Sequence, residues 1–178
     1  MGKIKISLDT NAVLDFCYRF YPKILFNALW ADLDRYVQAK TIEFHISESV
    51  KAELIGKVED YEFDKAVLQC FLDQFSVIEQ KRDDFGDAVL SIQNKLLTYE
   101  FSKKSKQATS PHADIDVISL ASKLGGLAIT SEQGFGNKFN PDINVHKDRG
   151  VKIPDVAKLL NIECGNWVYF LNKLGIKS

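Results

Sequence analysis

Four acidic residues stand at positions where a carboxylate could do chemistry. Asp9 directly follows the first apolar segment of the chain, and Glu132 comes shortly after another one. Glu53 and Asp114 lie in segments whose apolar residues recur with helical spacing. Open α/β folds bind their ligands where parallel strands end and helices begin. No cluster of cysteine or histidine accompanies these acids, and an oxygen-only set suits Mg²⁺ or Mn²⁺, ions that commonly serve phosphate chemistry.

The order of apolar segments predicts the elements that must position these acids. Strands are expected at about 3–9, 42–46, 127–130 and 143–145. Helices are expected at about 11–19, 22–39, 47–57, 59–76, 80–102, 112–124, 154–160 and 164–174. Ser47 is a suitable N-cap, and Gly125 with Gly126 is a typical helix stop. Strands separated by helices imply parallel pairing. The predicted fold class is α/β, a three-layer α/β/α sandwich with a mainly parallel central sheet.

Length and composition favour one soluble domain over residues 1–178, because no repeat or linker divides the 178-residue chain. The formal net charge of −1 argues against gripping nucleic acid by bulk positive charge, although a local patch would still serve. Three scattered cysteines indicate free thiols in a reducing compartment. We see no leader-like or membrane-spanning stretch. We therefore expect a cytoplasmic protein with no membrane association.

Helical geometry separates two aspartates that look alike in the sequence. At about 100° per residue, Asp114 falls in the same apolar stripe as Ile118, which must face the sheet. Asp116 falls on the opposite face, together with Ser119. Only Asp114 is therefore predicted to point inward. Each acid alone could have a local role as a cap or a loop residue, but several converging carboxylates would repel each other unless a divalent ion neutralised them.

The surroundings of the four acids resemble the PIN-domain nucleases, the fold of the VapC-type toxins. The segment 8–14, Leu-Asp-Thr-Asn-Ala-Val-Leu, is similar to the first acidic motif of that family. The segment 46–54, Ile-Ser-Glu-Ser-Val-Lys-Ala-Glu-Leu, is similar to the second, and the helix that begins Ala113-Asp114 is similar to the third. At the fourth position, Glu132 stands where most members have Asp.

The resemblance to PIN-domain nucleases covers only part of the chain. It covers about residues 3–135, and the chain exceeds a typical toxin by a helical elaboration at about 59–110 and a C-terminal extension at about 147–178. The segment 151–156, Val-Lys-Ile-Pro-Asp-Val, resembles the ending of an uncharacterised PIN subgroup that also prefers Glu at the fourth acid.

The resemblance implies a metal-dependent endoribonuclease that hydrolyses RNA, as the toxin of a toxin–antitoxin pair. The catalytic and metal-binding residues would be Asp9, Glu53, Asp114 and Glu132, holding Mg²⁺ or Mn²⁺. Supporting contacts to ligands or substrate would come from Asn11, Ser131 and Asp116. A basic cluster that could contact RNA consists of Lys103, Lys104 and Lys106. The partners implied are the RNA substrate, an antitoxin protein and a second copy of the chain.

Two other interpretations stay open. HAD-like phosphatases also place a nucleophile after the first strand, but they need Asp-x-Asp, and position 11 is Asn. A PIN-fold interaction module that has lost catalysis would agree with Glu at position 132, although all four charges remain. Six aromatic residues near the N-terminus are predicted to be core rather than a base-stacking surface: Phe16, Tyr18, Phe20, Tyr21, Phe26 and Trp30. Any exposed members could form a dimer or partner face.

Overall fold

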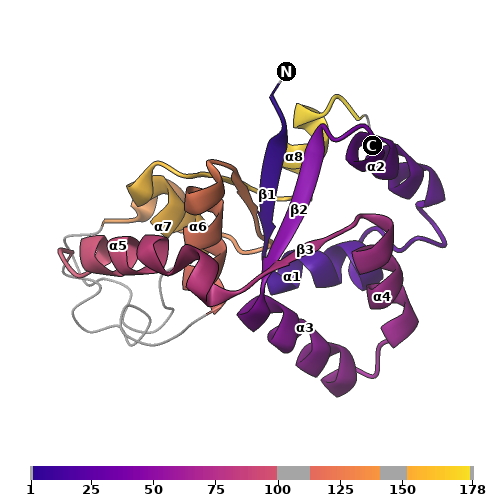
Figure 1. Cartoon of the computed structure of the whole chain (residues 1–178), viewed down its shortest axis with the longest axis horizontal. Helices are drawn as coiled ribbons and strands as arrows, with labels where there is room; N and C mark the ends of the chain where they lie inside the picture. The colour runs from indigo at the N-terminus through magenta and orange to yellow at the C-terminus, as the bar shows by residue number, and fades with distance from the viewer. Residues whose placement is uncertain (1, 100–112, 141–151, 177–178) are drawn as a thin grey trace.

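A five-stranded parallel sheet forms the centre of the protein. The computed structural model describes residues 2–99, 113–140 and 152–176. The strands are β1 (Ile4–Leu8), β2 (Ile42–Ser47), β3 (Ile78–Gln80), β4 (Leu127–Ile129) and β5 (Glu163–Gly165). Their order in the sheet is β3-β2-β1-β4-β5, and every pair is parallel (Figure 1). The predicted α/β class is confirmed.

Helices cover both faces of this sheet. They are α1 (Thr10–Leu14), α2 (Asn27–Gln38), α3 (Glu48–Asp60), α4 (Lys65–Gln74), α5 (Gly86–Leu96), α6 (Ala113–Leu124), α7 (Ile153–Leu160) and α8 (Trp167–Lys173). A π-helix, η1 (Asp15–Arg19), continues α1 directly. Short 3-10 helices occupy Arg82–Phe85 and Gly136–Lys138. Figure 1 shows α5, α6 and α7 on one side of the strands and α2, α4 and α8 on the other, which makes a three-layer α/β/α sandwich.

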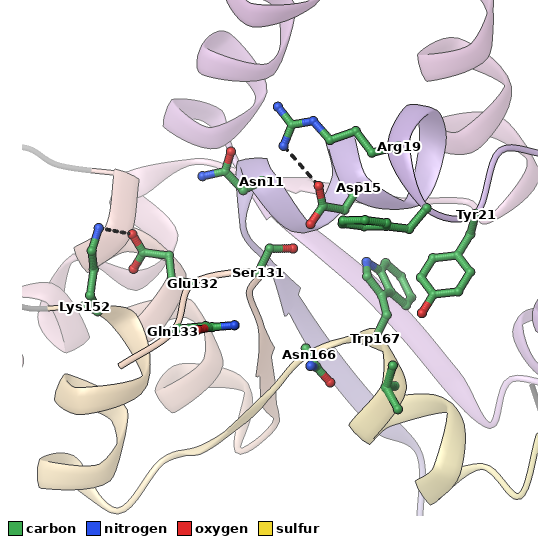
Figure 2. Close-up of a pocket in the computed structure, with 12 residues that line it drawn as sticks. Asn11, Asp15, Arg19, Tyr21, Ser131, Glu132, Gln133, Lys152, Asn166 and Trp167 are labelled. Atoms are coloured by element: carbon green, nitrogen blue, oxygen red, sulfur yellow. Dashed lines mark hydrogen bonds and ion pairs between the residues drawn. The ribbon is translucent and has the colours of Figure 1, made fainter. Parts of the chain in front are cut away.

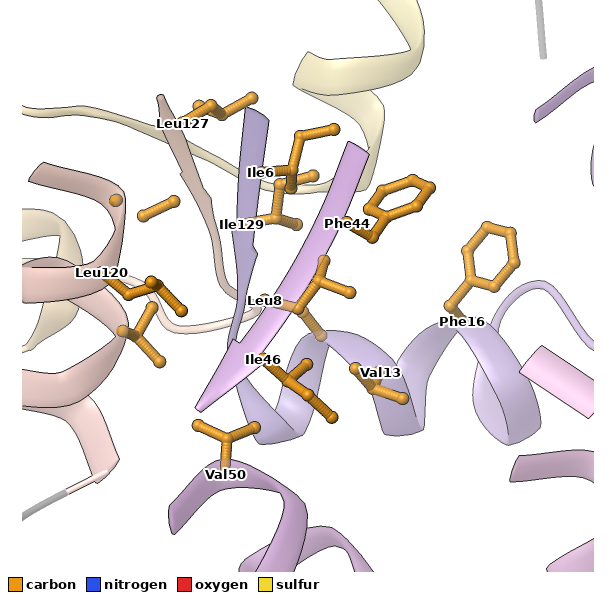
Figure 3. Close-up of a cluster of buried hydrophobic side chains, with 14 of the residues drawn as sticks. Ile6, Leu8, Val13, Phe16, Phe44, Ile46, Val50, Leu120, Leu127 and Ile129 are labelled. Atoms are coloured by element: carbon orange, nitrogen blue, oxygen red, sulfur yellow. The ribbon is translucent and has the colours of Figure 1, made fainter. Parts of the chain in front are cut away.

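The alternation of side chains along the strands distributes the core between the two layers. Ser7 of β1 points toward α6, where its hydroxyl donates to the carbonyl oxygen of Val117 at 2.9 Å. Phe44 of β2 packs in an aromatic cluster, with ring centroids 5.8 Å from Phe75 and 6.0 Å from Phe170. Figure 3 shows the buried apolar side chains of β1, β2 and β4 among those of α1, α3 and α6. This burial on both faces holds the end of β1, and therefore Asp9, in a fixed place.

Local signals located several boundaries correctly. The Ser47 hydroxyl accepts from the backbone N–H of Val50 at 3.3 Å, which confirms it as the N-cap of α3. Gly125 ends α6 with a φ of +60°, a conformation that disfavours other residues. At Gly126 the chain returns so close to β1 that an added Cβ would lie 2.2 Å from the carbonyl oxygen of Lys5.

Other boundaries differ from the predictions. β3 and β5 were not predicted, and β5 lies where the helix 164–174 was expected to begin. Each is a short edge strand with exposed or half-buried side chains, so neither forms the apolar run that marks the equally short β4. The helix expected from residue 22 begins at Asn27, because the Pro22 carbonyl accepts from Leu25 and Phe26 in a preceding turn. The predicted strand at 143–145 lies outside the described residues.

The aromatic prediction is right for some members and wrong for others. Phe16 and Trp30 are fully buried, as expected of core residues. Phe20 is 61% exposed and Phe26 is 39% exposed, so these two rings are surface residues. None of the described helices combines the length and the apolar character that crossing a membrane requires.

Candidate functional site

The two strands at the centre of the sheet place Asp9 and the segment before Glu132 side by side. The backbone N–H of Asp9 donates to the carbonyl oxygen of Ile129 at 2.9 Å, so the β1–β4 ladder continues up to Asp9. The chain leaves β1 toward β2 on one side, and β4 lies on the other side. Such a reversal of strand order opens a crevice at the carboxyl ends of the strands, where ligands bind in folds of this kind.

Asp9 is the N-cap residue of α1 by position, but its side chain does not cap the helix. Its carboxylate instead accepts a hydrogen bond from the Thr130 hydroxyl at 3.0 Å. This bond joins the ends of β1 and β4 and fixes the orientation of the carboxylate. The local explanation of Asp9 as a helix cap is therefore wrong.

Burial and neighbouring charge make Asp9 a poor place for a lone carboxylate. The residue is 3% exposed, and its pKa is raised to about 7. The main cause is loss of solvation, which the hydrogen bond from Thr130 opposes, and the carboxylates of Asp114, Glu132 and Glu53 raise the pKa further. Three charges that act on Asp9 in this way must lie near it. The charges of the three other acids that the sequence singled out thus act on Asp9.

Within the described part of the chain, the four carboxylates do not surround a common metal position. No three acidic, histidine or cysteine side chains there are arranged to hold a metal ion. Glu53, which is half-buried on α3, pairs with Lys57 at 2.7 Å and accepts from the Thr10 hydroxyl at 3.0 Å. Thr10 follows Asp9 directly, so this bond draws the Glu53 helix toward the end of β1. Asp114 lies in the first turn of α6, partly exposed.

Glu132 is held by the beginning of α7. One carboxylate oxygen lies 2.8 Å from the ammonium of Lys152, and the other accepts from the backbone N–H of Ile153 at 2.9 Å. The start of a helix favours an anion because its N–H groups are unpaired there. The pKa of Lys152 is raised, chiefly by its hydrogen bond to Glu132 and also by the charges of Asp114 and Asp9. Lys152 therefore neutralises the acidic cluster from its edge.

Asp155 is a buried residue of α7 that links this helix to the loop after Glu132. It is 2% exposed, and its two carboxylate oxygens accept from the backbone N–H of Phe135 at 2.8 and 3.0 Å. A Cβ at Gly134 would lie 2.6 Å from one of these oxygens, so the loop after Glu132 passes directly over the carboxylate. The segment 152–156 thus has a physical role in this chain: it binds Glu132 at one end and the following loop at the other.

Replacing Asp155 by alanine should therefore lower stability. The change leaves the partly buried N–H of Phe135 without its charged acceptor, and we expect a loss of about 2 kcal/mol in the free energy of unfolding. For a chain of this size that corresponds to a fall of roughly 4–8 °C in melting temperature. Calorimetry of Asp155→Ala would measure it. The control is Asp87→Ala, which removes an exposed acid from the first turn of α5. Equal melting temperatures for the two variants would show that the bond between Asp155 and Phe135 adds no stability.

Asp116 contradicts the facing prediction. It is 1% exposed rather than solvated, accepts from the Ser49 hydroxyl at 2.6 Å, and lies 3.5 Å from the guanidinium of Arg82. Ser119, predicted to share an outer face with Asp116, is fully buried as well. The reason is that α6 is covered on both sides, by the sheet and by α3, α5 and the 3-10 helix at Arg82–Phe85. Asp116 is thus held by a hydroxyl of α3 and by the guanidinium that follows β3.

A cleft of about 700 Å³ extends from Glu132 along η1 (Figure 2). Asn11 and Ser131, both predicted near the acids, line it. Asp15 and Arg19 also line it and were missed, although their i,i+4 spacing is a visible signal of a pair. The predicted RNA contacts Lys103, Lys104 and Lys106 lie outside the described residues.

Comparison with known proteins agrees with the extent of this fold. The model of a family described as a domain of unknown function, DUF4411, matches residues 6–178. The chain belongs to this family. The match begins inside β1 and includes α7 and α8, so the segment that holds Glu132 is part of the DUF4411 domain. No curated protein matches the chain.

Proposed function

We propose that this DUF4411 protein is a metal-dependent endoribonuclease that hydrolyses phosphodiester bonds in RNA at the crevice beside Asp9. The observation that carries the proposal is the environment of Asp9. A buried carboxylate next to three further acids is costly, and a divalent cation relieves that cost. The resemblance of the four acidic segments to PIN-domain nucleases supports the same chemistry.

The donor set fits Mg²⁺ or Mn²⁺, because every group in it is a carboxylate oxygen. Asp9, Glu53, Asp114 and Glu132 would hold the ion directly or through water. A bound divalent ion supplies an activated water and neutralises charge that develops on a phosphate. The protein's own contribution is placement: Thr130 orients the Asp9 carboxylate, and Thr10 orients that of Glu53.

Hydrolysis here requires a water molecule to lose a proton and its oxygen to bond to phosphorus while the opposite phosphorus–oxygen bond breaks, and the departing oxygen must gain a proton. Lys152 lies against the acids, and its ammonium pairs with Glu132. An ammonium in that place lowers the repulsion between the acids and an approaching RNA phosphate. Asn11 and Ser131 offer neutral hydrogen-bonding groups in the adjoining cleft.

Metal binding should be visible as thermal stabilisation. An ion at one hundred times its dissociation constant adds about 2.7 kcal/mol to the free energy of unfolding. For this chain length, the melting temperature should then rise by roughly 5–10 °C. Glu53→Gln should reduce the rise, whereas Glu59→Gln should not. Both residues lie on α3 and pair with a lysine, but Glu59 is exposed and pairs with Lys65. Identical Mn²⁺ titrations of wild type and both variants would argue against the site.

Cleavage tests the reaction itself. Metal-depleted protein should leave a labelled single-stranded RNA intact, cut it when Mn²⁺ or Mg²⁺ is added, and stop when the ion is chelated. Glu53→Gln, purified in parallel, controls for contaminating nuclease. Release of phosphate from p-nitrophenyl phosphate without RNA cleavage would favour a phosphatase instead. Metal-dependent stabilisation with neither reaction would favour a binding module.

A further inference from the structure

Arg19 lies in the same cleft as Glu132 but enters it from η1. Its guanidinium donates to the carboxylate of Asp15 at 3.0 Å and lies 5.9 Å from the centre of the Tyr61 ring. Asp15 is itself 7% exposed, so the anchor of this pair is buried while the guanidinium remains accessible. A guanidinium has five N–H donors in a planar fork, and the bond to Asp15 uses one of them. In Figure 2 the fork turns toward the side of the cleft where Asn11 lies.

The helix that carries Arg19 has an unusual form. Asp15–Arg19 is a π-helix that follows α1 without interruption. π-Helical turns are rare and frequently occur at functional sites, because the wider turn displaces side chains from their α-helical positions. Here the turn links Asp9, at the beginning of α1, with Arg19, at the end of η1, through one continuous helical segment. The backbone of Arg19 is thereby placed relative to Asp9 by one helical segment.

The side chains that line the cleft differ in charge from one end of it to the other. Glu132 and Lys152 lie at one end, and Figure 2 shows Arg19 on the opposite side. Neutral groups, including Asn11 and Ser131, lie between them. Phe20, next to Arg19 in the chain, lines the cleft with a ring that is 61% exposed. A phosphate-binding cation beside an exposed aromatic ring is the combination that proteins use for single-stranded nucleic acid.

We propose that Arg19 binds the backbone phosphate next to the scissile one in a single-stranded RNA, and that Phe20 stacks on the base of that nucleotide. The proposal rests on the proposed function for the position of the scissile phosphate. The cleft of about 700 Å³ lies within the range that encloses small ligands of nucleotide size. Asp15 acts as a positioning residue, since its carboxylate holds the guanidinium of Arg19.

The test is binding of fluorescein-labelled hexauridylate, measured by anisotropy in Mg²⁺ at several salt concentrations. An Asp114→Asn background prevents cleavage during the measurement. Arg19→Ala should raise the dissociation constant about tenfold, which corresponds to about 1.4 kcal/mol. It should also reduce the slope of log affinity against log salt by about 0.7, the value for one phosphate contact on a single strand. Arg19→Lys should keep the slope but recover only part of the affinity, because it keeps the charge and loses the fork.

Two control variants make the test specific. Arg35→Ala removes an arginine that also pairs with an aspartate, Asp32, on α2 away from this cleft, and it should leave binding unchanged. Phe20→Ala should weaken binding at least fivefold with no change in the salt slope, because stacking involves no counterion. Equal binding by Arg19→Ala and Arg35→Ala would overturn the proposal. So would normal RNA binding by Phe20→Ala together with a change in its oligomeric state, which would make this surface a protein interface.

The two proposals fail in different ways. If the wild type cleaves RNA and Arg19→Ala has the same KM, the proposed phosphate contact is wrong and the proposed nuclease activity is retained. If the wild type cleaves no RNA but binds hexauridylate, and Arg19→Ala loses that binding, the phosphate contact is supported and the proposed nuclease activity is wrong.

Discussion

Asp9→Asn should make the metal-free protein more stable and the metal-loaded protein inactive. The pKa of Asp9 in the folded protein is about 7, against 3.8 for an ordinary aspartate. Between these values the folded state binds more protons than the unfolded state, so the free energy of unfolding falls as the pH rises from about 4 to about 7. Above pH 7 the whole penalty is present. Asparagine carries no such charge and can still accept from Thr130 through its amide oxygen.

The stability difference should therefore depend on pH. With EDTA at pH 8, we expect Asp9→Asn to exceed the wild type by roughly 2 kcal/mol, a part of the free energy that a shift of about three pKa units represents. Near pH 3 the two proteins should unfold alike, because at that pH the wild-type carboxyl is protonated in the folded state and largely protonated in the unfolded one. Urea unfolding at the two pH values measures both differences. The exposed Asp87→Asn serves as the control and should show neither.

Activity should move in the opposite direction. Asp9→Asn removes the most buried of the four acids, so the Mn²⁺-induced rise in melting temperature should largely disappear. RNA cleavage should fall at least a hundredfold, about 2.7 kcal/mol of transition-state stabilisation. A variant that is less stable than the wild type without metal would show that Asp9 is a structural residue. Unchanged cleavage would place the reaction elsewhere.

Asp114→Asn and Asp116→Asn should fail for different reasons, although the two residues lie two positions apart on α6. Asp114 is one of the three acids that raise the pKa of Asp9. The variant Asp114→Asn should cleave RNA at least a hundredfold more slowly, while its melting temperature without metal should equal that of the wild type. Asp116 is buried against Ser49 and Arg82, and an amide there cannot balance the guanidinium. Breaking a buried ion pair costs about 3–5 kcal/mol, and the partial exposure of Arg82 reduces our expectation to about 2 kcal/mol.

The two variants are read out by one set of measurements: melting temperature in EDTA, its rise with Mn²⁺, and cleavage at a temperature where both variants are folded. Asp116→Asn should melt lower than the wild type yet retain most of the rise and most of the cleavage. The reverse pattern, with Asp116→Asn stable and inactive, would move the functional acid from Asp114 to Asp116. Arg82→Met should reproduce the stability loss of Asp116→Asn, since it removes the other half of the pair.

The sequence by itself determined the α/β class and the location of the acids. Asp9 and Glu132 could be placed because each follows an apolar strand, and parallel strands end at the same edge of a sheet. Glu53 was placed through its helix, whose N-cap, Ser47, is a local signal. These inferences needed only chain order and spacing. β3 and β5 were missed because their side chains are exposed or half-buried, whereas β4, which is equally short, is an apolar buried run.

The tertiary structure alone decided what surrounds each acid. The phase of α6 predicts different faces for Asp114 and Asp116, but phase does not reveal that α3, α5 and a 3-10 helix cover the far side of α6, and the prediction of a solvated Asp116 is therefore wrong. Burial of Asp116 therefore depended on segments more than twenty residues away in the chain. The partners of Glu132 likewise come from Lys152 and Ile153, beyond an intervening loop. Spacing within one element predicts which residues share a face, whereas the neighbours of that face are set by packing between distant elements.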